Sequence, residues 1–310
     1  MTSSGLPLSV TASLQNSKAE YRRLGSSGLH VSVSIMGCMS IGNRELADWV
    51  IDSEKALPLL KAAYDRGLKQ WDTASVYSNG DSERTIGRAI KEYEIPRQKL
   101  VLMAKAWGVT GEEQFAAYPI MDELRKNKDY FNQFELSRIS LINAVEGALA
   151  RLGTTYIDLF WFHRFDPYIH IEETMETLHN FVVAGKIRYI GASSVALCPW
   201  GPLAQGNLAR PVSVRGSTLR SANGGGDPST TRKESLAIIE RVQKLAEQKG
   251  WTMSQVTLAW TLRRVCSPIM GFSTVDRIDD ALSARGKQLS PDEEKFLEEP
   301  YTPLEIEGHY

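Results

Sequence analysis

The sequence predicts an α/β fold in which parallel strands alternate with helices and close into a (β/α)8 barrel. The chain has 310 residues, and a barrel of this kind needs about 250. Apolar runs of strand length are followed by amphipathic segments that stop at glycines. Asp72, Lys105 and His163 each close or directly follow an apolar run. Polar residues at the carboxyl ends of parallel strands are where such a barrel builds its active site.

Composition and charge favour a small-molecule partner. The 36 Lys and Arg nearly balance the 37 Asp and Glu, so no global charge recruits nucleic acid or a membrane surface. No apolar run approaches the roughly 18 residues of a membrane span. Three cysteines without a CxxC pair, and no cluster of metal ligands, predict a reduced, cytoplasmic protein without a metal. We expect one domain over residues 21–310, preceded by a flexible Ser-rich arm over residues 1–20.

The first half of the chain alternates strands and helices. A hairpin is predicted from residues 22–25 and 30–33, where it could cap the barrel bottom, and a strand then ends near Cys38. Glycine and proline residues that mark element boundaries predict the next elements, which are a helix over 53–66, a strand over 68–72, a helix over 82–93 and a strand over 99–105.

The second half repeats the pattern after a long insertion. Residues 107–138 are polar and aromatic, and loops of that length in compact domains usually serve binding, so this segment should overhang the site. The remaining units are a helix over 139–152, a strand over 156–163, a helix over 171–183 and a strand over 187–193.

The stretch Gln70–Ser78 sets a carboxylate and a phenol five residues apart where an apolar run ends. A phenol beside an acid is a candidate proton donor, and Lys105 and His163 arrive from later strand ends. Each residue also has a structural interpretation. Asp72 could cap a turn, Tyr77 could be a half-buried aromatic, and Lys105 and His163 could be polar strand ends facing water.

Several motifs of the sequence together resemble the aldo-keto reductases, from Tyr21 to the end of the chain. They are Asp72-Thr73-Ala74-x-x-Tyr77, Lys105, His163 between Asp158 and Asp166, residues 185–194 and residues 268–271. Residues 77–83 and 297–301 resemble fungal members grouped with aryl-alcohol dehydrogenases and polyketide-pathway reductases of secondary metabolism. The resemblance implies an NADPH-dependent reduction of an aldehyde or ketone, aromatic or polyketide-derived, on a (β/α)8 barrel.

The resemblance also implies roles for four residues. Tyr77 would donate a proton to the carbonyl oxygen, and a nearby Lys105 ammonium would favour the phenolate left behind. Asp72 would hold Lys105 charged and in place. His163 would hydrogen-bond and orient the substrate oxygen.

A cofactor site follows from the resemblance as well. The loop and helix over Gly271–Asp280 would hold the adenosine phosphate end of NADPH, with Arg277 on the 2′-phosphate. The loop over residues 199–206 would wrap the pyrophosphate. The implied contacts are Gly271, Ser273, Thr274, Arg277 and Asp280 near the adenosine, Pro202, Leu203 and Gly206 near the pyrophosphate, and Ser193 and Ser194 at the nicotinamide.

One piece of the barrel is missing from the sequence. Trp200 follows Ser193 by only 7 residues, whereas a βα unit of a barrel takes about 30, so about one and a half units are absent after Ser194. We therefore expect seven strands, no helix between Ser194 and Pro199, and a poorly held nicotinamide. Residues 212–214 alternate like a strand and could replace the lost sixth strand.

The deletion keeps a second function open. The chain could be a derived barrel with weak or lost redox activity that acts as a binding protein or as a non-redox acid-base enzyme. The sequence decides neither the substrate nor the oligomeric state.

Overall fold

A parallel sheet organises the fold. The computed structural model describes residues 5–113, 120–192, 198–214 and 232–303. Six strands pair in parallel in the order β10-β3-β6-β7-β8-β9. Their bounds are Ile269–Gly271 for β10, Ile35–Gly37 for β3, Gln70–Asp72 for β6, Val101–Ala106 for β7, Ile157–Phe162 for β8 and Ile187–Ala192 for β9. The predicted alternation of parallel strands and helices is confirmed.

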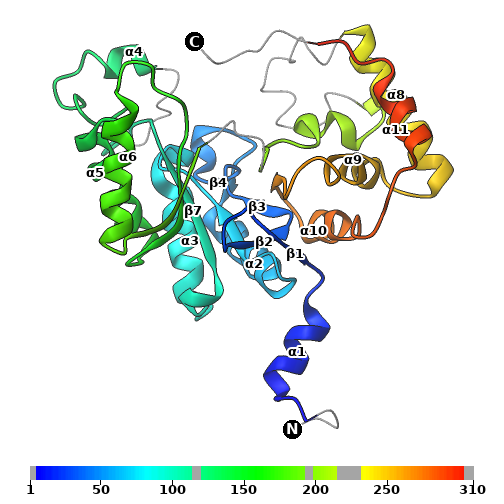
Figure 1. Cartoon of the computed structure of the whole chain (residues 1–310), viewed down its shortest axis with the longest axis horizontal. Helices are drawn as coiled ribbons and strands as arrows, with labels where there is room; N and C mark the ends of the chain where they lie inside the picture. Colours follow the sequence, from blue (N-terminus) through cyan, green and yellow to red (C-terminus); the bar gives the residue numbers. More distant parts are fainter. Residues whose placement is uncertain (1–4, 114–119, 193–197, 215–231, 304–310) are drawn as a thin grey trace.

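Helices cover one face of this sheet (Figure 1). They are α2 (Ser53–Asp65), α3 (Asp81–Glu92), α5 (Arg138–Leu152) and α6 (Ile171–Val183), each within about a residue of its predicted bounds. Alternate strand residues such as Trp71, Leu102 and Phe160 pack with them in one buried cluster, because successive side chains of a strand point to opposite faces. A short pair, β4 (Ile41–Gly42) and β5 (Ile51–Asp52), precedes α2.

The other face of the sheet encloses a smaller cluster. Ile35, Met103, Leu159 and Trp161 meet Val31 there. Val31 belongs to the antiparallel hairpin of β1 (Glu20–Arg23) and β2 (His30–Val33). The Gln70 side chain fixes the hairpin, because its Oε1 accepts from Ser32 N at 2.8 Å. The predicted hairpin and its place at the amino ends of the strands are confirmed.

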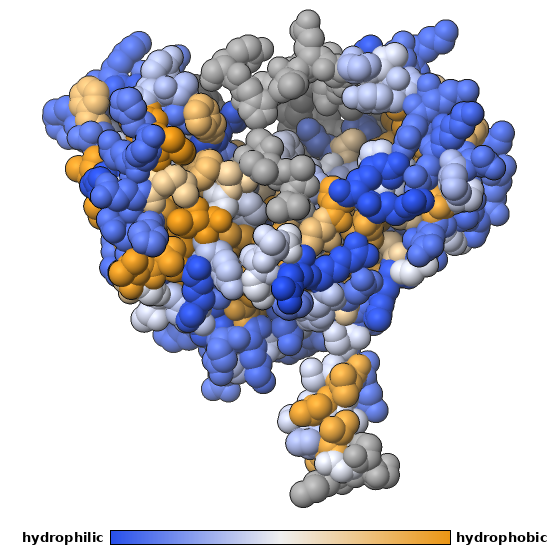
Figure 2. Space-filling model, viewed as in Figure 1, coloured by the Kyte–Doolittle hydropathy of each residue, from blue (hydrophilic) through white to orange (hydrophobic). Residues whose placement is uncertain are grey.

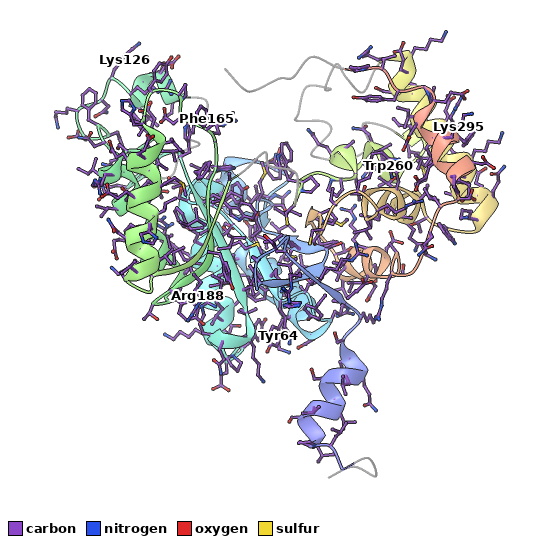
Figure 3. The ribbon with its side chains drawn as sticks, in the orientation of Figure 1. Tyr64, Lys126, Phe165, Arg188, Trp260 and Lys295 are labelled. Atoms are coloured by element: carbon purple, nitrogen blue, oxygen red, sulfur yellow. The ribbon has the colours of Figure 1, made fainter. Side chains whose placement is uncertain are left out.

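The C-terminal helices form a second lobe with a separate core (Figure 1). The three that share this core are α8 (Lys233–Lys249), α9 (Met253–Thr261) and α11 (Pro291–Glu298), whereas the buried residues of the neighbouring α10 (Val275–Leu282) belong to the main cluster under the sheet. Capping boxes begin α9 at Thr252 and α11 at Ser290. Trp260 of α9, labelled in Figure 3, points toward α11. Its Nε1 donates to Glu298 at the end of α11, at 2.7 Å.

The N-terminal arm contains a helix that no sequence pattern had indicated, α1 (Leu8–Asn16). It has no buried residue and extends away from the rest of the molecule (Figure 1). Figure 2 shows apolar residues on the surface of this helix, and Leu8 and Leu14 are 69% and 66% exposed. In the described ranges no helix is long and apolar enough to cross a membrane.

The described strands do not close into a barrel. Strand β9 ends one side of the sheet and β10 ends the other. Six of the seven strands that we expected are present in the described sheet, and beside β10 the described chain forms a single bridge, between Trp200 and Ile269. Residues 212–214 form a 3-10 turn, so the prediction of a replacement strand there was wrong. Most of the junction after Ser194 lies outside the described residues, and the chain from residue 198 to Leu203 contains no helix.

Candidate active site

Because successive side chains of a strand point to opposite faces, Asp72 and Lys105 lie on the face of the sheet away from the helices, at the carboxyl ends of β6 and β7. Lys105 Nζ donates to Asp72 Oδ2 at 2.5 Å, to Thr73 O at 2.9 Å and to Tyr77 Oη at 3.4 Å. The Asp72 and Lys105 side chains are only 2% and 6% exposed. The ammonium thus uses its three protons on a carboxylate, a carbonyl and a phenol, which satisfies a buried lysine completely.

Tyr77, beside this ion pair, is in ring contact with His163. Tyr77 begins a 3-10 turn, η2 (Tyr77–Gly80), and His163 directly follows β8. Their rings meet edge to face with centroids 5.9 Å apart and planes at 83°. His163 N donates to Ala106 O at 2.8 Å, which continues the β7–β8 pairing. The structure therefore brings Asp72, Tyr77, Lys105 and His163, hereafter the tetrad, into one cluster.

Burial and charge set the protonation states in the tetrad. Burial alone would lower the pKa of Lys105, but the Asp72 carboxylate and the Tyr77 hydroxyl outweigh it and raise that pKa above its ordinary value. Burial, helped by the positive charges of Lys105 and Arg164, lowers the pKa of His163 to about 3. At neutral pH the tetrad thus holds an ammonium and a neutral imidazole.

The two aspartates that flank His163 in sequence have structural partners. Asp158 Oδ2 accepts from Arg97 Nη2 at 2.6 Å and from Leu102 N at 2.9 Å. Asp166 accepts from the backbone of Leu136 and Tyr168. Phe165, between His163 and Asp166, is 69% exposed at the upper end of the sheet, opposite Arg188 near the start of β9 (Figure 3). These contacts fix the segment after His163 over the strand ends.

The start of α10 carries donors suited to a phosphate. Thr274 caps the helix, with its Oγ1 accepting from Arg277 N, and Arg277 Nη1 donates to Ser273 Oγ at 2.6 Å. Gly271 ends β10, in register with Gly37, which is itself in register with Asp72. The adenosine-side residues Gly271, Ser273, Thr274 and Arg277 are thus local neighbours.

Arg210 joins this group, although no sequence pattern singled it out. Its guanidinium packs over Gly206, where an added Cβ would lie 2.8 Å from Arg210 Nη2. Burial and the positive charge of Arg277 lower the pKa of Arg210. Two neighbouring guanidinium groups repel each other, and an anion between them removes that repulsion. Pro202 and Leu203 lie in the same loop, partly buried, so the loop and α10 fit an anionic phosphate group.

The structure does not group the other cofactor contacts that the resemblance implies with this phosphate site. The Asp280 carboxylate accepts from Thr252 Oγ1 and Gln255 Nε2, both at 2.9 Å, so it binds the start of α9. Ser193 and Ser194 lie outside the described residues. Trp200 was not assigned a role, yet its side chain is 67% exposed beside β10.

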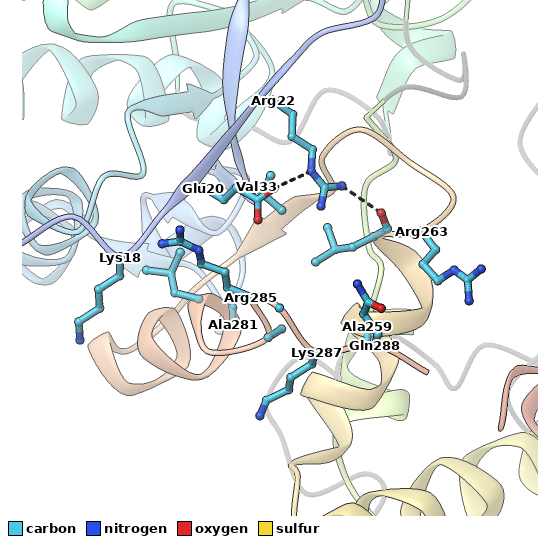
Figure 4. A pocket seen from close by; sticks show the side chains of 14 residues that line it. Lys18, Glu20, Arg22, Val33, Ala259, Arg263, Ala281, Arg285, Lys287 and Gln288 are labelled. Carbon is cyan, nitrogen blue, oxygen red and sulfur yellow. Dashed lines mark hydrogen bonds and ion pairs between the residues drawn. The ribbon is translucent and has the colours of Figure 1, made fainter. Parts of the chain in front are cut away.

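A separate cavity of about 250 Å³ lies away from the tetrad (Figure 4). It opens between β1, α9 and the turn after α10, and Val33 places it at the amino end of β3. Its cations are largely engaged: Arg22 with Glu20, Lys18 with Asp279, and Arg263 with Glu294. Figure 4 shows Arg22 bridging Glu20 and the carbonyl of Leu262.

Known proteins are similar in sequence to this chain over nearly its whole length. The family model described as Aldo/keto reductase family matches residues 35–197 and 192–301. An aldo-keto reductase of Metarhizium robertsii is 44% identical over 98% of this chain and 97% of its own. The versiconal hemiacetal acetate reductase of Aspergillus parasiticus is 38% identical, over 93% and 98%. A Schizosaccharomyces pombe protein named as an aryl-alcohol dehydrogenase is 35% identical, over 93% and 97%.

These matches also locate the missing piece. The alignment with the Metarhizium protein spans 358 positions, so at least 48 of them (358 less 310) have no residue in this chain. The family match breaks into two parts that meet at residues 192–197. Both observations agree with a deletion of about one and a half βα units after Ser194.

Proposed function

The chain belongs to the aldo/keto reductase family and is an oxidoreductase, and we propose that it reduces an aldehyde or ketone with NADPH, with Tyr77 as the proton donor. The observation that carries this proposal is the contact of Lys105 Nζ with both Asp72 Oδ2 and Tyr77 Oη. A family fold alone does not fix a function, whereas a buried ammonium aimed at a phenol is a specific chemical device.

The proton transfer follows from this geometry. Bound NADPH would supply a hydride to the carbonyl carbon, which leaves negative charge on the oxygen. Tyr77 Oη accepts from Lys105, and in the proposed reaction the phenol would give its own proton to the substrate oxygen. The phenolate that forms is stabilised by the ammonium, and Asp72 keeps that ammonium in position.

His163 suits a positioning role toward the same oxygen. Its imidazole is neutral at physiological pH because burial lowers its pKa to about 3. A neutral imidazole presents one N–H donor, and the edge-to-face contact with Tyr77 sets its place. Two donors, one from the turn after β6 and one from the residue after β8, would then fix the carbonyl oxygen in one orientation.

The preference for NADPH rests on positive charge near α10. Arg277 and Arg210 lie close enough to influence each other electrostatically, and Ser273 and Thr274 add hydroxyls. NADPH differs from NADH by a 2′-phosphate, which two guanidinium groups suit. The exposed indole of Trp200 offers an aromatic surface beside the same loop.

The names of the relatives favour an aromatic or polyketide-derived substrate in secondary metabolism. One relative is named for versiconal hemiacetal acetate and another for aryl alcohols. We extend that substrate class to this chain because the identities hold over more than nine tenths of it. We also place the reaction in the cytoplasm, where NADPH is plentiful.

The open sheet favours a second candidate function, a binding protein that has lost redox activity. Losing the piece between β9 and β10 removes support for the nicotinamide, and misplacing reacting groups by about 1 Å can cost on the order of 100-fold in rate. Turnover should therefore be low.

One experiment decides between the two functions. The purified chain is given NADPH and a panel of aromatic aldehydes and ketones, and both NADPH oxidation and NADPH binding are measured. Slow oxidation that disappears in Tyr77→Phe supports the reductase. Binding without any oxidation supports the second candidate, and the absence of both refutes the cofactor assignment.

A further inference from the structure

The turn that carries Tyr77 is strained. Ser78 and Asn79 both adopt left-handed backbone angles, with φ 48° and ψ 44° for Ser78 and φ 51° and ψ 43° for Asn79. Such angles cost a non-glycine residue on the order of 1–3 kcal/mol and persist only where surrounding contacts impose them. Two in succession, directly after the proposed proton donor, therefore require contacts that hold the turn.

The Asn79 side chain supplies those contacts. It is buried, and its Nδ2 donates to Glu113 O at 2.7 Å and to Gly111 O at 3.1 Å. Its Oδ1 accepts from Gly111 N at 2.8 Å. Thr110 adds a parallel tie, because its Oγ1 donates to Ser75 O at 2.9 Å. Both amide protons and the amide oxygen of Asn79 thus form hydrogen bonds with the segment that follows β7, the strand of Lys105.

The opposite side of the turn is closed by β4. Gly42 has φ 149°, and an added Cβ there would lie 2.2 Å from Ser78 Cβ. Only a glycine allows β4 to approach Ser78 this closely. The turn is therefore held between β4 and residues 110–113, and a change on either side would be transmitted to Tyr77.

The contact between Tyr77 and Lys105 has little tolerance for such a change. At 3.4 Å it is near the limit of a useful hydrogen bond, whose heavy-atom distance is ordinarily about 2.7–3.2 Å. A displacement of a few tenths of an ångström away from Lys105 would remove it. The position of the turn thus decides whether the phenol contacts the ammonium.

We propose that Asn79 is a positioning residue for proton donation, holding the Tyr77 phenol against Lys105 by tying the turn to residues 110–113. The inference rests on the proposed function of Tyr77. It also couples the proton donor to the beginning of the segment over residues 107–138. A substrate that shifts residues 110–113 would thereby shift the phenol.

The test uses Asn79→Gly, which removes the amide while still allowing the left-handed backbone. The readout is the titration midpoint of the Tyr77 phenol, followed by NMR of ring-labelled tyrosine and assigned with Tyr77→Phe. Loss of the ammonium contact should raise the midpoint by about 1 pH unit, the scale of a nearby opposite charge. Thr110→Val, which removes the parallel tie, should raise it less.

A matched control is Glu94→Gly. Glu94 is also left-handed, with φ 48°, but it is exposed in the turn after α3. It should leave the phenol titration unchanged. An unchanged midpoint in Asn79→Gly would overturn the proposal, and so would an equal shift in Glu94→Gly.

Turnover provides a second readout. In a chain that reduces carbonyls, Asn79→Gly should lower kcat about 10-fold or more with little change in NADPH affinity, as expected for displaced reacting groups. A variant with wild-type kcat would contradict the proposal. Because the phenol titration needs no turnover, failure of the reductase assignment and failure of the Asn79 assignment remain distinguishable.

Discussion

Lys105 Nζ lies 2.5 Å from Asp72 Oδ2 in a pair that is almost completely shielded from water. Burying both charges is costly, so the pair persists because each member neutralises the other. The ion pair also positions the ammonium, since the Lys105 Nζ that Asp72 holds in place is the atom that contacts Tyr77.

Asp72→Asn should destabilise the chain by about 3–5 kcal/mol, because it leaves the Lys105 ammonium buried without a counter-charge. Urea unfolding measures this loss. The double variant Asp72→Asn with Lys105→Met should recover part of it, since no charge then remains buried. Glu54→Gln, which breaks an exposed pair with Arg88, should leave the free energy of unfolding almost unchanged. Equal effects at both pairs would contradict this account.

Tyr77→Phe should abolish carbonyl reduction while leaving NADPH affinity nearly unchanged. The substitution removes only the hydroxyl, so it removes a contact made in the transition state and none made with the cofactor. Steady-state kinetics and a binding titration on the same preparation measure both quantities. A fully active Tyr77→Phe protein would refute the assignment of the proton donor.

His163 should make the chain less stable in mild acid. Its folded pKa of about 3 lies below its ordinary 6.5, so the unfolded state binds the proton more readily between these values. Stability from this group is therefore complete above pH 6.5 and declines as pH falls toward 3. Between pH 7.5 and 5 the loss should be up to about 2 kcal/mol. Urea unfolding of wild type and His163→Gln at both pH values isolates it, and identical losses would show that another group is responsible.

Arg277→Ala should weaken NADPH by about 1.5–3 kcal/mol, the scale of a charged hydrogen bond, and barely affect NADH. Arg210→Ala should act in the same direction, because Arg210 lies beside Arg277. Arg285→Ala serves as the control, since Arg285 lines the separate cavity. Isothermal titration with each cofactor measures the difference. Equal losses for NADPH and NADH would mean that neither arginine reads the 2′-phosphate.

Local patterns predicted the strands and helices that carry the tetrad. Asp72, Lys105 and His163 end apolar runs, and helix-stop glycines such as Gly153 bound the intervening units. Both signals lie within a few residues of the element they define, so they can be recognised in the sequence without knowledge of the tertiary structure. The grouping of Asp72, Lys105 and His163 then follows from the parallel pairing of their strands.

Non-local contacts escaped prediction. Alternation at Val212–Val214 suggested a strand, but Val214 N donates to Pro211 O and closes a 3-10 turn instead. The meeting of Arg210 with Arg277, and of Asn79 with Gly111, joins segments whose proximity depends on how strands pair. No spacing in the sequence encodes such contacts, because they arise only after the sheet has formed.

In the described sheet the outer edge of β9 is unpaired and that of β10 carries only the bridge between Trp200 and Ile269, which has a consequence for assembly. An unpaired edge is a template for any strand that can complete its backbone hydrogen bonds. The segment that relatives carry at this junction is therefore a natural ligand for the chain that lacks it. A separately synthesised peptide of that segment should bind between these edges. The chain and the peptide would then form a complemented, two-part protein.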